Sequence, residues 1–127
     1  MNLLLDTHTV IWFFEGDSNL GAAAKNHIEN AANTNFVSIA TFWEIAIKIS
    51  INKLNMQIPL QNLKSLIWKN GMEILPITIE HTLLVSQLPF HHKDPFDRLL
   101  AAQSMNENMV LVSRDEKFKF YNIQTIW

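Results

Sequence analysis

Short apolar runs alternate with longer segments whose apolar residues recur at helical spacing. The runs at residues 2–5, 36–38, 72–75, 109–112 and 123–126 have the length of buried strands, the last of them an edge strand. Helices are predicted at 7–15, 22–32, 38–50, 60–70, 78–87 and from 95 onward, with a short helix or turn at 115–121. Strands that alternate with helices predict an α/β domain with a parallel sheet covered by helices on both faces.

Capping residues mark where several of these helices begin and end. Asp94 followed by Pro95 is a strong start, because proline suits the first helical position and an aspartate can accept the free N–H groups before it. Asp6 or Thr7 is the expected cap of the first helix, and Gly16 its end.

The helix at 7–15 contains an apolar run longer than one helix face can hide. This run is Val10, Ile11, Trp12, Phe13 and Phe14. Such a helix either lies inside the core or shares its surface with another chain. We expect part of the run, Trp12 or Phe13, to contact a second copy of the chain or a partner helix.

Composition narrows the class of protein. The chain has 127 residues, 48% of them hydrophobic and 17% charged, which predicts one domain with a substantial core. It has no cysteine, which excludes disulfides and thiolate metal sites and favours a cytoplasmic location. Asp6 interrupts the first apolar run, and no apolar stretch has membrane-spanning length, so we expect neither a signal peptide nor a membrane anchor. The net charge of −2 predicts that any nucleic-acid binding is local.

Four acidic residues are placed where a parallel sheet binds its ligands, beyond the carboxyl ends of the strands. Asp6 directly follows the first strand, and Asp115 comes three residues after another. Glu44 lies in the second turn of the helix after residues 36–38, and Asp97 is in the first turn of its helix. Asp97 shares a helix face with small residues, which directs its carboxylate inward.

Each acid also has a structural explanation. Asp6, Asp94, Asp97 and Asp115 could cap helices, and Glu44 could pair with Lys48 one turn later. Taken together, four acids in one cleft would repel one another unless a cation neutralised them. Carboxylates without thiolates suit a hard divalent ion, Mg²⁺ or Mn²⁺.

Other catalytic arrangements find less support. His91 and His92 are adjacent, so their side chains should diverge, and His8 is either a supporting group or a surface residue. No zinc-hydrolase motif, phosphate-binding glycine loop or serine nucleophile motif is present. A phosphatase of the haloacid-dehalogenase type would need an aspartate where His8 stands.

Four segments resemble the PIN-domain family, and more narrowly its VapC-like toxin ribonucleases. They are L-L-L-D-T-H at 3–8, V-S-I-A-T-F-W-E-I-A-I-K at 37–48, H-H-K-D-P-F-D-R-L-L-A-A-Q at 91–103 and L-V-S-R-D at 111–115. The resemblance covers nearly the whole chain as a single domain, 1–127. It matches Asp6, Glu44, Asp97 and Asp115 to the family's acidic quartet, with Asp94, Ser113 and Thr7 as possible supporting residues.

The resemblance implies a three-layer α/β/α sandwich, a Mg²⁺- or Mn²⁺-dependent endoribonuclease, a homodimer and a small antitoxin partner. RNA contacts are expected from the basic residues near the acids, which are Lys48, Lys93, Arg98 and Arg114. Arg98 could instead pair with Asp94. The alternative is a non-catalytic module that uses the same acidic cleft to bind a partner's arginine.

Overall fold

A computed structural model describes all residues, 1–127. Its core is a five-stranded parallel sheet with the order β3-β2-β1-β4-β5. The strands are β1 (Asn2–Leu5), β2 (Thr34–Ser38), β3 (Glu73–Leu75), β4 (Val110–Val112) and β5 (Thr125–Ile126). This confirms the α/β class and the parallel sheet.

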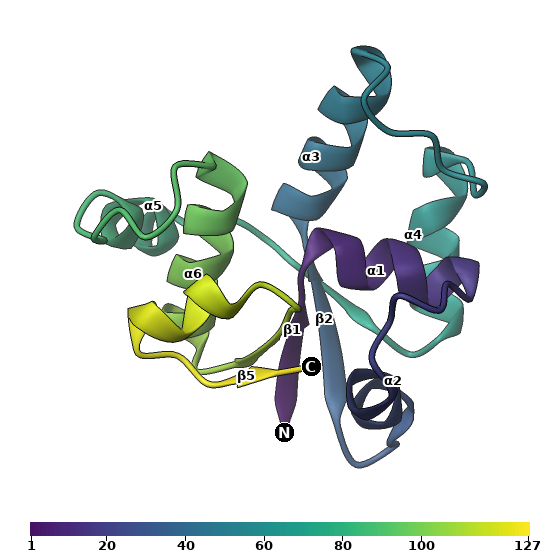
Figure 1. Cartoon of the computed structure of the whole chain (residues 1–127), viewed down its shortest axis with the longest axis horizontal. Helices are drawn as coiled ribbons and strands as arrows, with labels where there is room; N and C mark the ends of the chain where they lie inside the picture. The colour runs from purple at the N-terminus through teal and green to yellow at the C-terminus, as the bar shows by residue number, and fades with distance from the viewer.

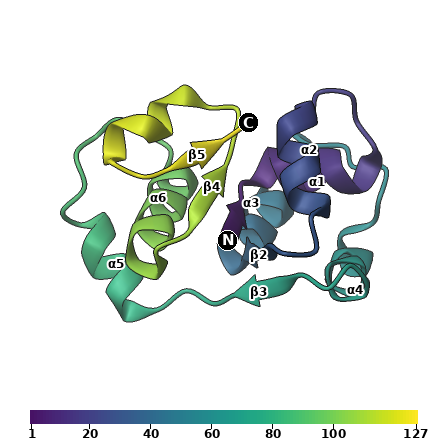
Figure 2. The ribbon, with the colours of Figure 1, turned by 90° about the horizontal axis from the view of Figure 1, so that it is seen from below.

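Helices cover both faces of the sheet, as expected for a sandwich. Figure 1 shows α5 and α6 on one side of the strands and α1, α2 and α4 on the other, and Figure 2 shows the same division from below. The helices are α1 (Thr7–Glu15), α2 (Ala22–Glu29), α3 (Ile39–Ser50), α4 (Leu60–Lys69), α5 (Ile79–Val85) and α6 (Pro95–Glu107), followed by the 3₁₀ helix η1 (Glu116–Tyr121). None of them combines the length and apolar character needed to cross a bilayer.

Alternate strand residues supply two separate cores, one on each face of the sheet. Leu3 and Leu5 of β1 face the cluster that includes Ile45 and Ile67. Leu4 between them faces the cluster that includes Leu100 of α6. Because successive side chains of a strand point to opposite faces, an unbroken apolar strand is the pattern that a two-sided core requires.

Two predicted helices end earlier in the structure than the sequence pattern suggests. The helix predicted to extend to residue 32 ends at Glu29, because Asn30 takes an extended conformation and its side chain accepts a hydrogen bond from Ala32 N at 2.9 Å. An asparagine side chain that bonds the neighbouring backbone in this way competes with helix continuation. The helix predicted to extend to residue 87 ends at Val85.

The order of the strands creates a crevice at the carboxyl edge of the sheet. From β1 the chain proceeds to β2 and β3 on one side and then returns to β4 on the other side of β1. Connections therefore leave β1 and β4 in opposite directions, which opens a space beyond the ends of these two strands. The backbone N–H of Asp6 donates to the Val112 carbonyl at 3.2 Å and so joins the two strand ends at this point.

The apolar run in α1 is packed more completely than its sequence suggests. Val10 and Ile11 are buried, and Trp12, Phe13 and Phe14 are half-buried against the same core. The most exposed large apolar side chains lie elsewhere: Trp68 is 85% exposed, Phe90 80% and Ile79 73%. Trp12 is covered in part by Trp127 from the C-terminus, whose ring it meets edge-on at 5.8 Å.

The two-sided core predicts a large cost for truncating a central strand residue. Leu111 of β4 is fully buried, whereas Leu83 on the outer face of α5 is 60% exposed. We expect Leu111→Ala to lower the free energy of unfolding by about 2 to 5 kcal/mol, because a cavity remains where the side chain was. The matched Leu83→Ala change should cost less than about 0.5 kcal/mol in the same urea titration. Equal losses in the two variants would contradict this assignment of the core.

Candidate functional site

A cleft of about 310 Å³ opens at the carboxyl edge of the sheet, and all four acids matched by sequence line it. Asp94 also lines it, so five carboxylates share this one space. The full set of lining residues is Asp6, Thr7, His8, Trp12, Glu44, Lys48, Asp94, Asp97, Arg114 and Asp115.

Asp6 is both the end of β1 and the N-cap of α1. Its Oδ1 accepts a hydrogen bond from Thr9 N at 2.9 Å, so the capping expected from the sequence is present. Burial raises the pKa of Asp6, and this effect exceeds the opposing contacts with Ser113 and Thr9. Asp6 therefore has both positions considered from the sequence, because one of its carboxylate oxygens caps α1 while the residue also lines the cleft.

Glu44 enters the cleft from α3 and is held from two sides. Thr7 Oγ1 donates to Glu44 Oε1 at 2.6 Å, and Lys48 Nζ bonds the other oxygen. Thr41 Oγ1 lies 3.2 Å from Thr7 Oγ1 and extends this network. The pair with Lys48 that the sequence offered as an alternative does form, but Glu44 is buried and lines the cleft rather than a solvated helix face.

Asp94 and Asp97 begin α6. Asp94 Oδ1 accepts hydrogen bonds from Phe96 N at 2.7 Å and Asp97 N at 3.2 Å, which confirms it as the N-cap. The Asp97 carboxylate receives no such bond from the protein. Burial, together with the charges of Asp94, Glu44 and Asp115, raises the pKa of Asp97 to about 7. Asp97 is therefore the acid whose charge the surrounding protein compensates least.

Asp115 follows β4 and caps η1. Its Oδ1 accepts from Lys117 N at 2.9 Å, and its backbone N–H donates to Ser113 Oγ at 3.1 Å. Burial alone would raise the pKa of Asp115, but the hydrogen bonds from His92 and Lys117 outweigh burial and lower it. Asp115 and Asp97 thus have pKa values displaced in opposite directions within one cleft.

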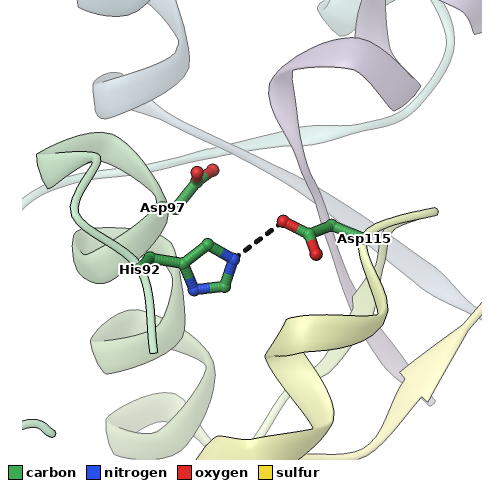
Figure 3. Close-up of side chains that lie close together, drawn as sticks. All are labelled: His92, Asp97 and Asp115. Atoms are coloured by element: carbon green, nitrogen blue, oxygen red, sulfur yellow. Dashed lines mark hydrogen bonds and ion pairs between the residues drawn. The ribbon is translucent and has the colours of Figure 1, made fainter. Parts of the chain in front are cut away.

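His92 is the site residue that sequence reasoning missed. It is buried, and its Nε2 lies 2.7 Å from Asp115 Oδ2. Figure 3 shows its ring directed at the Asp115 carboxylate, with Asp97 beside them. One potential ligand atom from each of these three residues lies within 4.8 Å of the others. The rings of His91 and His92 both pack against Tyr121, and only His92 contacts Asp115. The useful signal was the position of His92 just before the Asp94-Pro95 helix start.

Two of the four basic residues expected to contact RNA line the cleft. Lys48 is paired with Glu44, and the Arg114 guanidinium lies 4.9 Å from the centre of the Trp12 ring. Lys93 is exposed but does not line the cleft.

Arg98 has a different position from the one expected. Its guanidinium is buried, donates to the carbonyls of Val85, Leu88 and Pro89 at 3.0–3.2 Å, and stacks over Phe90. It is neither paired with Asp94 nor part of the cleft lining. Its bonds fix the segment between α5 and α6, which carries His92.

Solved structures with the same fold span nearly the full length of this chain. A chain in the crystal structure of VapBC2 from Rickettsia felis bound to a promoter DNA fragment has a TM-score of 0.72 at 21% identity, covering 99% of this chain and 98% of that one. Chains of VapBC-1 from nontypeable Haemophilus influenzae and of DNA-bound VapBC from Salmonella typhimurium have TM-scores of 0.70 and 0.68, at 16% and 15% identity. Each covers 99% of this chain and 97% of the other.

The sequence itself supplies a separate comparison. No curated protein sequence matches the chain. The family model described as PIN domain matches residues 3–123, a span that contains the five cleft carboxylates. The chain therefore belongs to the PIN-domain family.

Proposed function

We propose that this PIN-domain chain is a VapC-like nuclease that cleaves RNA with Mg²⁺ or Mn²⁺ and acts as the toxin of a type II toxin–antitoxin pair. The observation that carries the proposal is the convergence of Asp6, Glu44, Asp97 and Asp115 on one cleft from four different parts of the chain. The likeness to chains of VapBC structures supports the toxin assignment.

The cleft residues fit a hard divalent cation. Its acids offer oxygen ligands, which Mg²⁺ and Mn²⁺ prefer. The Asp97 carboxylate has no protein donor, and burial raises its pKa to about 7, so its ionised form lacks a positive partner. Lys48 and Arg114 are the only lysine or arginine side chains in the lining, against five carboxylates. A bound dication would supply the missing charge.

We assign Asp6, Asp97 and Asp115 to metal binding, with Glu44 completing the site directly or through water. Bound Mg²⁺ or Mn²⁺ would lower the pKa of a water and stabilise the charge that develops on the phosphate. Glu44 is fixed by Thr7 and Lys48, so we assign it the role of orienting the attacking water. Ser113 and Thr7 support the site by positioning Asp115 and Glu44.

Substrate contact falls to Arg114 and Lys48, with Lys93 at the periphery. Since the net charge of the chain is −2, RNA binding depends on these few cations and on the metal, and it should weaken steeply with salt. By analogy with the VapBC structures, we also propose a cognate antitoxin as partner. From the resemblance to VapC-like toxins and the absence of cysteine, we further propose a homodimer that acts in the cytoplasm.

The first test is the Asp97→Asn variant. The amide keeps the shape of the side chain but removes a metal-binding charge, so we expect RNA cleavage to fall by at least about 100-fold, the range seen when a metal site or an electrostatic catalyst is disrupted. Glu80→Gln, which makes the same change at an exposed position on α5, should leave cleavage unaltered. RNA and p-nitrophenyl phosphate should be assayed side by side, with Mn²⁺ and with EDTA.

The outcomes of this assay separate the candidate functions. Cleavage of RNA that requires Mn²⁺ and Asp97 supports the proposal. Full activity of Asp97→Asn would remove Asp97 from the site, and hydrolysis of p-nitrophenyl phosphate alone would favour a phosphatase. Folded protein that binds RNA or an arginine-rich partner peptide without any hydrolysis would favour the non-catalytic module.

The second test uses the stability of the metal-free protein as a function of pH. The pKa of Asp97 is raised from 3.8 in the unfolded chain to about 7, so between these values the folded protein retains a proton that the unfolded chain has lost. The free energy of unfolding should therefore decrease as pH rises from about 4 to about 7. Asp97→Asn should reduce this decrease, and its Tm in EDTA at pH 8 should exceed that of the unaltered chain.

Addition of Mn²⁺ at pH 8 should reverse the ranking of the two proteins. The metal binds only the folded, ionised site, so it should raise the Tm of the unaltered chain more than that of Asp97→Asn. Differential scanning calorimetry with Mn²⁺, and with EDTA as control, measures both effects. A Tm that does not respond to Mn²⁺ would contradict the proposed metal site.

The third test concerns assembly. We expect the purified chain to sediment as a dimer at micromolar concentration. Since Trp12 and Phe13 are only half-buried, Trp12→Glu or Phe13→Glu should weaken dimerisation or antitoxin binding more than folding. Analytical ultracentrifugation measures assembly and circular dichroism measures folding. A monomeric parent together with two unfolded variants would show that the run belongs wholly to the core.

A further inference from the structure

Behind Asp115 lie two hydrogen-bonded polar side chains, His92 and Tyr121, that the proposed chemistry leaves without a role. Tyr121 Oη lies 2.9 Å from His92 Nδ1, and His92 Nε2 lies 2.7 Å from Asp115 Oδ2. Both Tyr121 and His92 are buried, at 3% and 6% exposure. Buried polar groups in a connected chain must divide their donors and acceptors consistently.

The hydrogen bonds select one tautomer of His92. The backbone N–H of His92 donates to Tyr121 Oη at 2.9 Å, so this oxygen is an acceptor there. His92 Nδ1 is the only other hydrogen-bond partner of Tyr121 Oη, so we place the phenol hydrogen toward Nδ1. With the phenol donating to Nδ1, the ring hydrogen is on Nε2, facing a carboxylate that accepts it.

The His92 ring is also fixed sterically. It lies parallel to the Tyr121 ring, at 5.5 Å between centroids with planes 7° apart, and against Phe118 at 4.5 Å. Its backbone belongs to the segment that Arg98 ties down through the carbonyls of Leu88 and Pro89. The donor that faces Asp115 is thus fixed in direction as well as in identity.

We propose that His92, oriented by Tyr121, is a positioning residue that holds the Asp115 carboxylate for metal binding and is not itself a ligand. Asp115 is held at both oxygens, Oδ2 by His92 and Oδ1 by Lys117 N. Each oxygen keeps a further lone pair, so the carboxylate can still bind a cation in the cleft. Partners of this kind around a metal ligand typically change metal affinity by about 10- to 100-fold when they are removed. The inference rests on the proposed metal site.

The competing reading is that His92 binds the metal directly. One ligand atom from each of His92, Asp97 and Asp115 lies within 4.8 Å of the others, which is close enough for a shared ion. Direct binding would require the Nε2 lone pair, hence loss of the Nε2 hydrogen. The two readings therefore differ in a measurable proton position.

Nitrogen NMR of the unaltered protein reports that proton directly. With ¹⁵N-labelled histidine, long-range correlation spectra distinguish a protonated ring nitrogen from an unprotonated one. We expect His92 to carry its hydrogen on Nε2 both without metal and at saturating Mg²⁺. Loss of the Nε2 hydrogen on addition of Mg²⁺, or a hydrogen on Nδ1 in the free protein, would overturn the proposal.

Mn²⁺ affinity of variants, measured by isothermal titration calorimetry, gives the second readout. Glutamine at position 92 places an amide N–H near the position of Nε2, whereas leucine supplies no donor. We expect His92→Leu to weaken Mn²⁺ binding by about 10- to 100-fold and His92→Gln to retain affinity within about 3-fold. Equal losses in both would indicate a direct ligand and overturn the proposal.

Tyr121→Phe tests the orientation step and does not depend on whether His92→Leu folds. Without the phenol, His92 can adopt either tautomer, so Mn²⁺ binding should weaken, by less than in His92→Leu. The same change made in the His92→Gln background should have a smaller effect, because an amide has no tautomer to select. Unchanged Mn²⁺ affinity in Tyr121→Phe would show that Tyr121 does not orient His92 for this purpose.

His81 provides the matched control. It is fully buried and has two polar partners of its own, Thr78 N at 3.0 Å and Glu107 Oε1 at 2.8 Å, but it lies outside the cleft. His81→Leu should lower the Tm without changing Mn²⁺ affinity. Absence of Mn²⁺ binding by the unaltered chain would overturn the proposed metal site itself, whereas Mn²⁺ binding that His92→Leu leaves unchanged would overturn only the role of His92.

Discussion

Repulsion among carboxylates is the constraint around which the cleft is built. Five acids line one space of about 310 Å³, and the sheet topology brings the ends of β1 and β4 together beside it. The protein compensates the negative charges of these acids unequally. Glu44 and Asp115 receive hydrogen bonds from Thr7, Lys48 and His92, whereas Asp97 receives none. The uncompensated charge is thereby concentrated at one residue, where a proton or a cation must balance it.

The fold can support such a site because its own stability comes from elsewhere. Two apolar clusters, one on each face of the sheet, pack the strands and helices, and Trp12 is the one cleft residue that packs against them. Three of the acids stand at helix N-caps, where free backbone N–H groups donate hydrogen bonds to their carboxylates. Residues such as Asp6, Asp94 and Asp115 thus stabilise local structure while they supply negative charge to the cleft.

The sequence predicted the parts of this arrangement that depend on local pattern. The unbroken apolar strands indicated a sheet covered on both faces, and the position of Asp6 directly after β1 indicated the edge at which the acids would meet. What it could not predict depends on long-range contacts. The partner of Arg98 is a set of backbone carbonyls, which no side-chain pattern encodes. The role of His92 depends on Tyr121, which is 29 residues away. Likewise the contact of Trp12 with Trp127 joins residues from opposite ends of the chain.

The buried position of Arg98 affects which substitutions a genetic selection on this protein would recover. Arg98 directly follows Asp97 in the sequence segment 91–103. Its guanidinium, however, donates to carbonyl groups at the end of α5 and in the segment before Asp94, and so holds this backbone in place. In a selection for loss of the proposed nuclease activity, substitutions at Arg98 would be recovered alongside those of the acids, although Arg98 does not line the cleft. Such a selection would thus group two kinds of residue together: the acids that line the cleft, and an arginine that holds the backbone in place beside it.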